Sequence, residues 1–231
     1  MKTKYSLVLP SYNEYGNLKL LLPEIFKSFF KRNYQIIIVD DNSIDQTIKK
    51  LKKEFKRRKQ IKYILRKKNR SLGLSIKKGI EASSGENIIV MDSDFNHRPQ
   101  DLKKMILKYE KNKLDMLCGS RFLKGGSSNT FFRHLCSLFF NIFINILTKG
   151  NISDNLSGFF IVKKKYIRKD LKKIFYGYGE FYIRLLFFMQ KKKIKISEFP
   201  VKYALRKYGN SKSRLVRMLF LYTKETIKLL K

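Results

Sequence analysis

Two aspartates separated by one residue, Asp92 and Asp94, follow directly on the short apolar run 87–91. Such a run is typical of a buried strand, so both carboxylates can turn to the same side where the strand ends. Carboxylate oxygens are the hard ligands that Mg²⁺ and Mn²⁺ prefer, and an ion held there could neutralise phosphate charge on a leaving group. Asn96 adds a neutral amide oxygen as a third candidate ligand. His97 is a further candidate, but a lone histidine is more often a hydrogen-bonded loop residue, and that interpretation is preferred.

Other acidic residues follow other predicted strands, in a chain with only 18 Asp and Glu against 52 Lys and Arg. Glu14 follows the first strand, and Asp40, Asp41 and Asp45 follow the second. In a parallel α/β sheet, the carboxyl ends of the strands form the edge where ligands bind. We therefore expect these carboxylates to line a ligand site, although Asp45 taken alone is interpreted as a turn or helix-cap residue.

Short apolar runs alternate with longer, lysine-rich amphipathic segments, a pattern typical of βαβ units and a mainly parallel sheet flanked by helices. The predicted strands are 5–9, 36–39, 61–65, 87–91, 114–118, 159–162 and 194–199. The predicted helices are 16–30, 44–58, 72–82, 99–112, 135–147, 181–190 and 211–231. No repeat or low-complexity linker divides the chain, so we expect a single α/β domain of residues 1–231.

The formal net charge of +34 at pH 7 predicts polyanionic partners. Nucleic acid, an anionic membrane surface and phosphorylated substrates all meet this condition, and charge alone does not distinguish them. The joint abundance of Lys, Ile, Asn and Phe also fits coding DNA rich in A and T. Part of the lysine excess therefore needs no functional explanation.

The sequence predicts neither secretion nor a membrane span. Cys118 and Cys136 form no C-x-x-C pair and no cluster with histidine, so we expect no disulfide or zinc site and a reducing cytosol. Met1 leads almost directly into the first strand, without an apolar leader. The longest apolar stretch, 135–147, is interrupted by asparagine and falls short of the roughly 20 residues that cross a bilayer.

Six short motifs occur in a fixed order. They are Pro-Ser-Tyr-Asn-Glu at 10–14, Val-Asp-Asp-Asn-Ser-Ile-Asp-Gln-Thr at 39–47, Gly-Leu-Ser-Ile-Lys-Lys-Gly at 73–79, Ser-Gly-Glu at 84–86, Met-Asp-Ser-Asp at 91–94 and Gly-Ser-Arg at 119–121. Together they resemble the family-2 inverting glycosyltransferases, in particular the dolichol-phosphate mannose synthase group of polyprenyl-phosphate sugar transferases. The resemblance extends from about residue 5 to about 213. It implies the Rossmann-like α/β fold called GT-A, with amphipathic helices toward the C-terminus.

The resemblance implies that about residues 1–125 bind a nucleotide-sugar, with Tyr12 stacking and Asp40 accepting hydrogen bonds. The residues implied in this binding are Pro10, Tyr12, Asn13, Glu14, Asp40, Asp41, Asp92 and Asp94. Asp92 and Asp94 match the family's metal and donor-phosphate aspartates, which implies Mg²⁺ or Mn²⁺ as cofactor and Asp94 as a catalytic residue. The family usually has glutamine where this chain has Asn96, so a bridging water is an alternative to direct coordination by Asn96.

The resemblance also implies that about residues 126–231 face the acceptor and the membrane. The basic and polar residues that match acceptor-phosphate positions are Arg121, Arg133, Arg206, Ser211 and Lys212, of which Arg121 is implied to be catalytic. Arginine suits this task because its planar fork grips phosphate with two hydrogen bonds. The segment 154–159 resembles the family's D-x-x-S-G-F motif, with Phe160 where an arginine often follows, and a positional role is expected for it.

The expected reaction is a metal-dependent, inverting transfer of a sugar to a polyprenyl phosphate lipid. GDP-mannose is the preferred donor and a UDP-sugar the alternative. An acceptor phosphate, with a second pKa of about 6, is largely an oxyanion at neutral pH and needs no general base. The helices around 135–147 and 215–230 either lie in the membrane interface or pack on the sheet. We expect a cytoplasmic protein, peripheral on the cytoplasmic face of the membrane, with or without a separate membrane subunit.

Two other functions stay open at this point. A glycosyltransferase that acts on a hydroxyl of a surface glycan would keep the fold and donor but would need a general base. A nucleic-acid-binding protein would account for the charge of +34, but it leaves the strand-end carboxylates without a role, so no nucleic-acid partner is expected. A dehydrogenase is excluded because no G-x-G-x-x-G follows the first strand.

Overall fold

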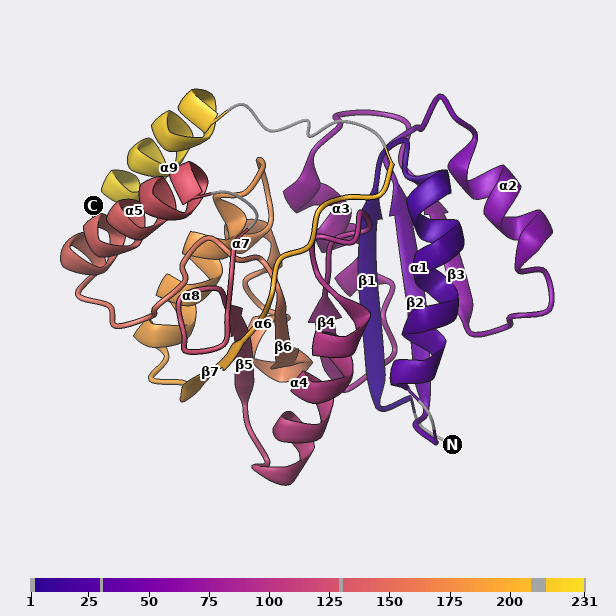
Figure 1. Ribbon diagram of the computed structural model, residues 1–231, viewed down its shortest axis with the longest axis horizontal. Helices are drawn as coiled ribbons and strands as arrows, with labels where there is room; N and C mark the ends of the chain where they lie inside the picture. The colour runs from indigo at the N-terminus through magenta and orange to yellow at the C-terminus, as the bar shows by residue number, and fades with distance from the viewer. Residues whose placement is uncertain (1–2, 30, 129–130, 209–214, 231) are drawn as a thin grey trace.

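The structure is a computed structural model that describes residues 3–29, 31–128, 131–208 and 215–230. A seven-stranded sheet runs through its centre in the order β3-β2-β1-β4-β6-β5-β7 (Figure 1). The strands are β1 Tyr5–Ser11, β2 Tyr34–Asp40, β3 Ile61–Leu65, β4 Asn87–Val90, β5 Met116–Ser120, β6 Phe160–Lys163 and β7 Ile196–Pro200. The β1–β2, β1–β4, β2–β3 and β5–β7 pairs are parallel, whereas β6 runs antiparallel to both β4 and β5.

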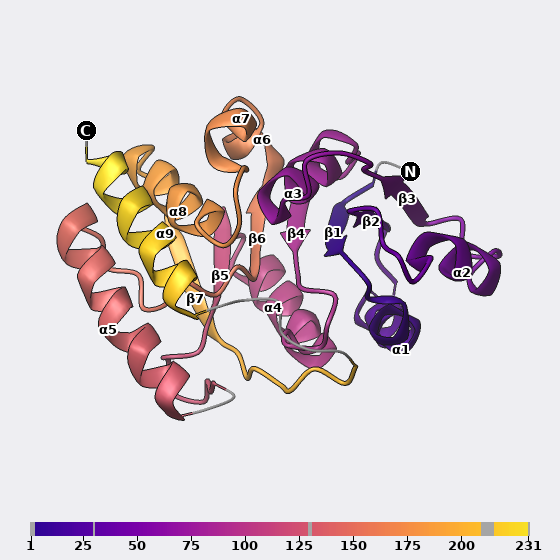
Figure 2. The ribbon, with the colours of Figure 1, turned by 90° about the horizontal axis from the view of Figure 1, so that it is seen from above.

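Helices cover both faces of the sheet, and α5 and α9 lie side by side at the β7 end (Figure 2). One face carries α1 (Tyr15–Ser28), α2 (Thr47–Glu54) and α4 (Pro99–Lys111). The other carries α3 (Leu72–Glu81), α6 (Lys164–Ile167), α7 (Leu171–Ile174) and α8 (Phe181–Lys191). The outer pair is α5 (Phe131–Thr148) and α9 (Leu215–Leu229).

The central strand β1 is buried along its whole length because helices pack on both of its faces. Successive side chains of a strand point to opposite faces, so Leu7 and Leu9 enter the core beneath α1 and α4. Val8 enters the core beneath α3. A continuous apolar run in the sequence thus forms the strand whose carboxyl end reaches the candidate site.

The α/β prediction with a mainly parallel sheet is confirmed, and the predicted strands and longer helices are found with small shifts at their ends. The predicted helix 44–58 is shorter, because side-chain contacts hold its first residues in a turn. Asn13 Oδ1 accepts the N–H of Ile44 at 2.8 Å, and Asp45 Oδ1 accepts the N–H of Thr47 at 2.9 Å. The interpretation of Asp45 as a turn residue is therefore confirmed, whereas the N-cap of α2 is Gln46.

The predicted division near residue 125 and the single domain stay predictions. β6, which belongs to the later part, lies between β4 and β5 of the earlier part, so both parts contribute to one sheet. Within the described ranges, no helix is long and apolar enough to span a membrane.

A first prediction concerns Gly73, which lies where α3 touches the loop after α7. A Cβ at this position would lie 2.5 Å from the backbone oxygen of Tyr176. Although alanine usually favours a helix over glycine, we expect Gly73→Ala to lower the free energy of unfolding by about 1–3 kcal/mol through overpacking. Urea denaturation measures this, with Lys78→Ala on the exposed side of the same helix as control. A variant as stable as the unmodified protein would contradict the close approach.

Candidate active site

Acidic residues from the ends of β1 and β4 meet around one guanidinium group. Arg206 Nη2 donates to Glu14 Oε1 at 3.0 Å and to Asp94 Oδ2 at 2.6 Å. The hydroxyl of Ser93 donates to the carbonyl of Pro10 at 2.7 Å, which ties the loop after β4 to β1. Residues 80 positions apart are thereby brought to one point at the carboxyl edge of the sheet.

The arginine is delivered by residues 201–208, here called the strap, which crosses the carboxyl edge of the sheet from β7 toward α1 (Figure 1). The N–H of Ala204 donates to the carbonyl of Asn96 at 3.1 Å. At the far end, Tyr208 and Asn17 exchange two hydrogen bonds of 3.0 and 3.1 Å. The strap is thus held by hydrogen bonds both before and after Arg206.

The surroundings of Asp92 disfavour its ionised form, although part of its side chain reaches the surface. Partial burial of the side chain, together with the nearby carboxylates of Asp94 and Glu14, raises the pKa of Asp92 to about 8, while Arg206 acts in the opposite direction. Among the described residues, the carboxylates of Glu14, Asp92 and Asp94 outnumber the one guanidinium in contact with them, that of Arg206, which favours a further cation.

The donor groups of Asp92 and Asp94 fit a divalent ion that is shared with a phosphorylated ligand. Across the described ranges, no three side chains of His, Cys, Asp or Glu converge as ligands of one ion. Mg²⁺ typically takes one or two carboxylates together with phosphate oxygens and waters, so a complete protein cage is not needed. Asn96 donates its N–H and its side-chain amide to the two oxygens of Asp94, both at 3.0 Å. Asn96 therefore orients Asp94, and its role as a metal ligand stays a prediction.

His97 lies directly behind the carboxylates and is fully buried. Its Nδ1 accepts the backbone N–H of Asp92 at 2.9 Å. Its Nε2 lies 2.8 Å from the hydroxyl of Tyr203 and 3.2 Å from the carbonyl of Ser157. Burial lowers the pKa of His97 to about 4, so the ring is neutral at physiological pH. Its interpretation as a hydrogen-bonded loop residue is confirmed.

A basic cavity of about 420 Å³ lies at the same edge of the sheet, beyond the ends of β1, β2 and β3. Its walls are formed by Tyr12, Asp41, Asn42, Ile44, Arg66, Lys67, Lys68 and Arg70. The guanidinium of Arg70 lies 4.2 Å from the centre of the Tyr12 ring, a distance typical of a cation–π contact. The cavity therefore offers an aromatic surface and several cations to a ligand.

Three of the residues predicted to bind the nucleotide instead contact other residues of the loops around this cavity. Asp40 accepts hydrogen bonds from the side chains of Ser11 and Ser43. Asp41 forms an ion pair with Arg66. Asn13 adopts a left-handed conformation, φ 56°, from which it bridges to the loop after β2. The contacts of Asp40, Asp41 and Asn13 with a ligand stay predictions.

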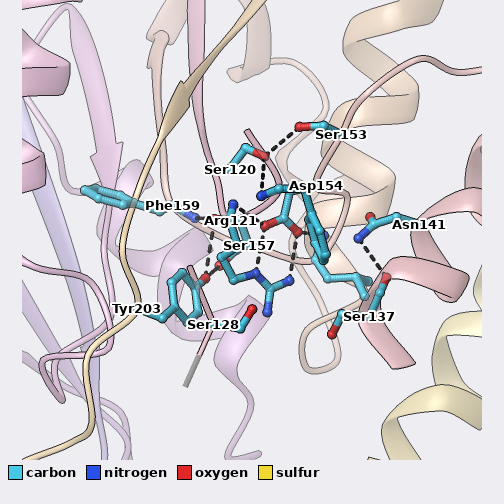
Figure 3. Close-up of polar contacts among 12 residues, drawn as sticks. Ser120, Arg121, Ser128, Ser137, Asn141, Ser153, Asp154, Ser157, Phe159 and Tyr203 are labelled. Carbon is cyan, nitrogen blue, oxygen red and sulfur yellow. Dashed lines mark hydrogen bonds and ion pairs between the residues drawn. The ribbon is translucent and has the colours of Figure 1, made fainter. Parts of the chain in front are cut away.

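Arg121 forms a buried ion pair with Asp154 (Figure 3). Its Nε and Nη2 donate to the two oxygens of Asp154, each at 2.8 Å, and Asp154 is completely buried. The guanidinium also lies 4.8 Å from the centre of the Tyr203 ring. Two of the donors of Arg121 are therefore committed to Asp154, and the predicted contact of its other N–H groups with an acceptor phosphate stays a prediction.

Three of the predicted acceptor residues cannot be placed by their side chains. Arg133 belongs to α5, but its side chain lies outside the described part of the structure. Ser211 and Lys212 lie outside the described residues altogether. Their roles stay predictions.

Some residues of the site were not predicted from the sequence. The basic run of 66–70 follows β3 directly, and the strand-end rule used for β1, β2 and β4 would have selected it had it been applied there too. Tyr203 and Asn17 carry no comparable signal, because their roles depend on the path of the strap.

The pattern of the family named glycosyl transferase family 2 matches residues 6–171, which contain most of the sheet and the carboxylates of the site but not the strap. The chain belongs to glycosyl transferase family 2. A dolichol-phosphate mannosyltransferase of Pyrococcus furiosus is 32% identical over 99% of this chain and 64% of its own length. A dolichyl-phosphate beta-glucosyltransferase of Dictyostelium discoideum is 28% identical over 86% of this chain and 65% of its own length. The chain thus spans slightly less than two thirds of these relatives.

Solved structures share the fold of this chain. Glucosyl-3-phosphoglycerate synthase of Mycobacterium tuberculosis, in complex with Mn²⁺, UDP and glucosyl-3-phosphoglycerate, superimposes with a TM-score of 0.74 at 15% identity. The alignment covers 99% of this chain and 80% of that protein. TarS of S. aureus in complex with UDP-GlcNAc superimposes with a TM-score of 0.64 at 18% identity, over 99% of this chain and 70% of that one. These likenesses establish the predicted GT-A fold.

The raised pKa of Asp92 leads to a prediction about stability and pH. Because the folded protein favours the protonated carboxyl, the contribution of Asp92 to stability falls as pH rises from about 4 to about 8. Asp92→Asn removes this contribution. We expect the metal-free variant to gain stability relative to the unmodified protein across this range, with the difference levelling off at higher pH.

Urea denaturation at several pH values, in the presence of EDTA, measures this difference. Asp115→Asn is the control, because the hydrogen bond from Lys163 lowers the pKa of Asp115 and its replacement should reduce stability at neutral pH. Parallel pH profiles for Asp92→Asn and the unmodified protein would contradict the assignment.

Proposed function

We propose that this family-2 domain transfers a sugar from a nucleoside diphosphate to the phosphate of a polyprenyl lipid. The observation that carries the proposal is the meeting of Glu14 and Asp94 with the guanidinium of Arg206 at one edge of the sheet. The carboxylates suit a metal–diphosphate donor, and the cation suits an anionic acceptor. The negatively charged groups that suit the donor and the positively charged group that suits the acceptor are therefore adjacent.

On the donor side, the cavity beside Tyr12 accommodates the nucleoside, and the diphosphate extends toward Asp92 and Asp94. These two aspartates would hold Mg²⁺ or Mn²⁺, which supplies positive charge to the departing diphosphate when it is bound. The solved neighbours that contain Mn²⁺ or Mg²⁺ with UDP support this reading. The preferred donor is GDP-mannose, by likeness to the mannosyltransferase, and a UDP-sugar is the alternative, by likeness to the glucosyltransferase.

On the acceptor side, Arg206 and Arg121 hold the lipid phosphate against the anomeric carbon of the sugar. Arg206 reaches the site from the strap, and the guanidinium of Arg121 lies 4.8 Å from the centre of the Tyr203 ring. The acceptor phosphate is already an anion, so the protein has to orient it and offset its charge rather than remove a proton. The names of both sequence relatives contain a dolichol phosphate, which supports a lipid phosphate acceptor.

The lipid acceptor places the domain at a membrane surface, and α5 and α9 provide an apolar surface for it. Its exposed side chains are Phe132, Leu135, Leu138, Phe139, Ile142 and Ile146 on α5, Phe220 and Ile227 on α9, and Leu230 directly after α9. The inner side of α5 packs through Ile144 on Ile183 and Tyr222. α5 contains no acidic residue and the one of α9, Glu225, is buried, so an anionic membrane meets no repulsion there. We therefore place the protein on the cytoplasmic face of the membrane.

Asp94→Ala is predicted to reduce sugar transfer by at least about 100-fold, because it removes a ligand of the ion that offsets charge in the transition state. The assay combines the purified protein, Mg²⁺, a short polyprenyl phosphate and a panel of nucleotide sugars. Asp115→Ala, whose partner Lys163 lies away from the site, is the matched control. Near-normal turnover by a folded Asp94→Ala variant would remove the metal assignment.

Membrane binding is predicted to depend on the outer side of α5. Phe139 and Ile146 are 63% and 71% exposed, and replacing both with serine should weaken binding to vesicles. The loss should be roughly 10-fold or more, since a buried large apolar side chain contributes about 1.5–3 kcal/mol. Flotation with phosphatidylserine vesicles measures it, and Leu65→Ser with Leu107→Ser, both 49% exposed elsewhere, is the control pair. Equal binding by both double variants would contradict this surface.

A further inference from the structure

One buried imidazole connects three segments that come from different parts of the chain. His97 Nδ1 accepts the N–H of Asp92, and its Nε2 contacts the carbonyl of Ser157 and the hydroxyl of Tyr203. The ring also stacks on Phe159, with 4.7 Å between ring centres and 18° between the planes. The loop after β4, the loop before β6 and the strap are thus joined by one side chain.

The hydrogen-bond partners fix which nitrogen of His97 carries the proton. Because Nδ1 accepts from a backbone N–H, the proton lies on Nε2. Nε2–H then donates to the Ser157 carbonyl or the Tyr203 oxygen, and the Tyr203 hydroxyl donates to the same carbonyl. Every polar atom of the ring has a partner, so the imidazole can neither turn nor flip without breaking one of these bonds.

The contacts of Tyr203 extend this connection to the acceptor side of the site. Its ring lies beneath the guanidinium of Arg121, which is held in place by Asp154 (Figure 3). A continuous row of contacts therefore leads from the backbone of Asp92 through His97 and Tyr203 to Arg121.

We propose that His97 is a positioning residue that sets the metal-binding loop and the acceptor arginine relative to one another. This inference rests on the proposed function, in which Asp92 faces the donor diphosphate and Arg121 the acceptor phosphate. In-line attack requires the reacting groups to be close and aligned, and small displacements lower the reaction rate strongly. His97 is buried and hydrogen-bonded at both ring nitrogens, which suits a fixed spacer rather than a group that touches substrate.

Two substitutions distinguish the contact made by Nδ1 of His97 from the contacts made by its Nε2. Asparagine at position 97 ends near the place of Nδ1, so His97→Asn can keep the hydrogen bond with Asp92 but loses Ser157 and Tyr203. Glutamine reaches the place of Nε2, so His97→Gln can keep the second set and loses the first. Both variants lose the stacking on Phe159 equally. Tyr203→Phe, which removes a single hydroxyl, serves as a milder variant for the acceptor end.

Three readouts are compared for these variants: exchange of the Asp92 backbone amide, Mn²⁺ affinity in the presence of a nucleoside diphosphate, and the KM for polyprenyl phosphate. His97→Gln should lose amide protection and Mn²⁺ affinity, the latter by roughly 10- to 100-fold. His97→Asn and Tyr203→Phe should keep both within about 3-fold and instead raise the acceptor KM, by roughly 10-fold or more.

Equal effects of the Asn and Gln variants on all three readouts, or no effect of either, would overturn the inference. Failure of the proposed function is recognised separately, as an unmodified protein that transfers no sugar to polyprenyl phosphate. Even then the amide exchange tests the contact of His97 with Asp92 on which the inference depends, because it requires neither metal nor turnover. Protection retained in His97→Asn and lost in His97→Gln supports it, and the reverse order contradicts it.

Discussion

Repulsion between carboxylates at one edge of the sheet is the constraint on which the other features of the site depend. Parallel pairing of β1 with β4 brings Glu14 close to Asp92 and Asp94, so that their negative charges repel one another. A single guanidinium from the strap, that of Arg206, offsets part of this repulsion. The remaining negative charge makes the edge a place where a metal ion and the phosphates bound to it are stabilised.

On the acceptor side of the site, a buried cation has to be stabilised. Arg121 is kept there by its paired contacts with Asp154 and by the ring of Tyr203. Buried ion pairs contribute little net stability because both partners lose their hydration. Such a pair is better understood as fixing position, and His97 then relates that position to the carboxylates.

The sequence was most informative where local chemistry determines structure. Buried parallel strands appear as continuous apolar runs, so the ends of β1, β2 and β4 and their acids were predictable. The place of β6 between β4 and β5 was not, because strand order is set by long-range pairing and leaves no local pattern. The same holds for the strap, whose residues have no periodicity, so the contact of Arg206 with Glu14 and Asp94 was beyond prediction.

The central claim is that the acids around Arg206 form the binding place of a metal–diphosphate ligand. A crystal structure of the protein with Mn²⁺ and a nucleoside diphosphate tests it most directly. We expect the ion between the phosphates and the carboxylates of Asp92 and Asp94, with the base in the cavity beside Tyr12. A diphosphate bound instead to the basic residues 66–70, with Arg206 still joined to Glu14 and Asp94 and no ion beside them, would contradict it.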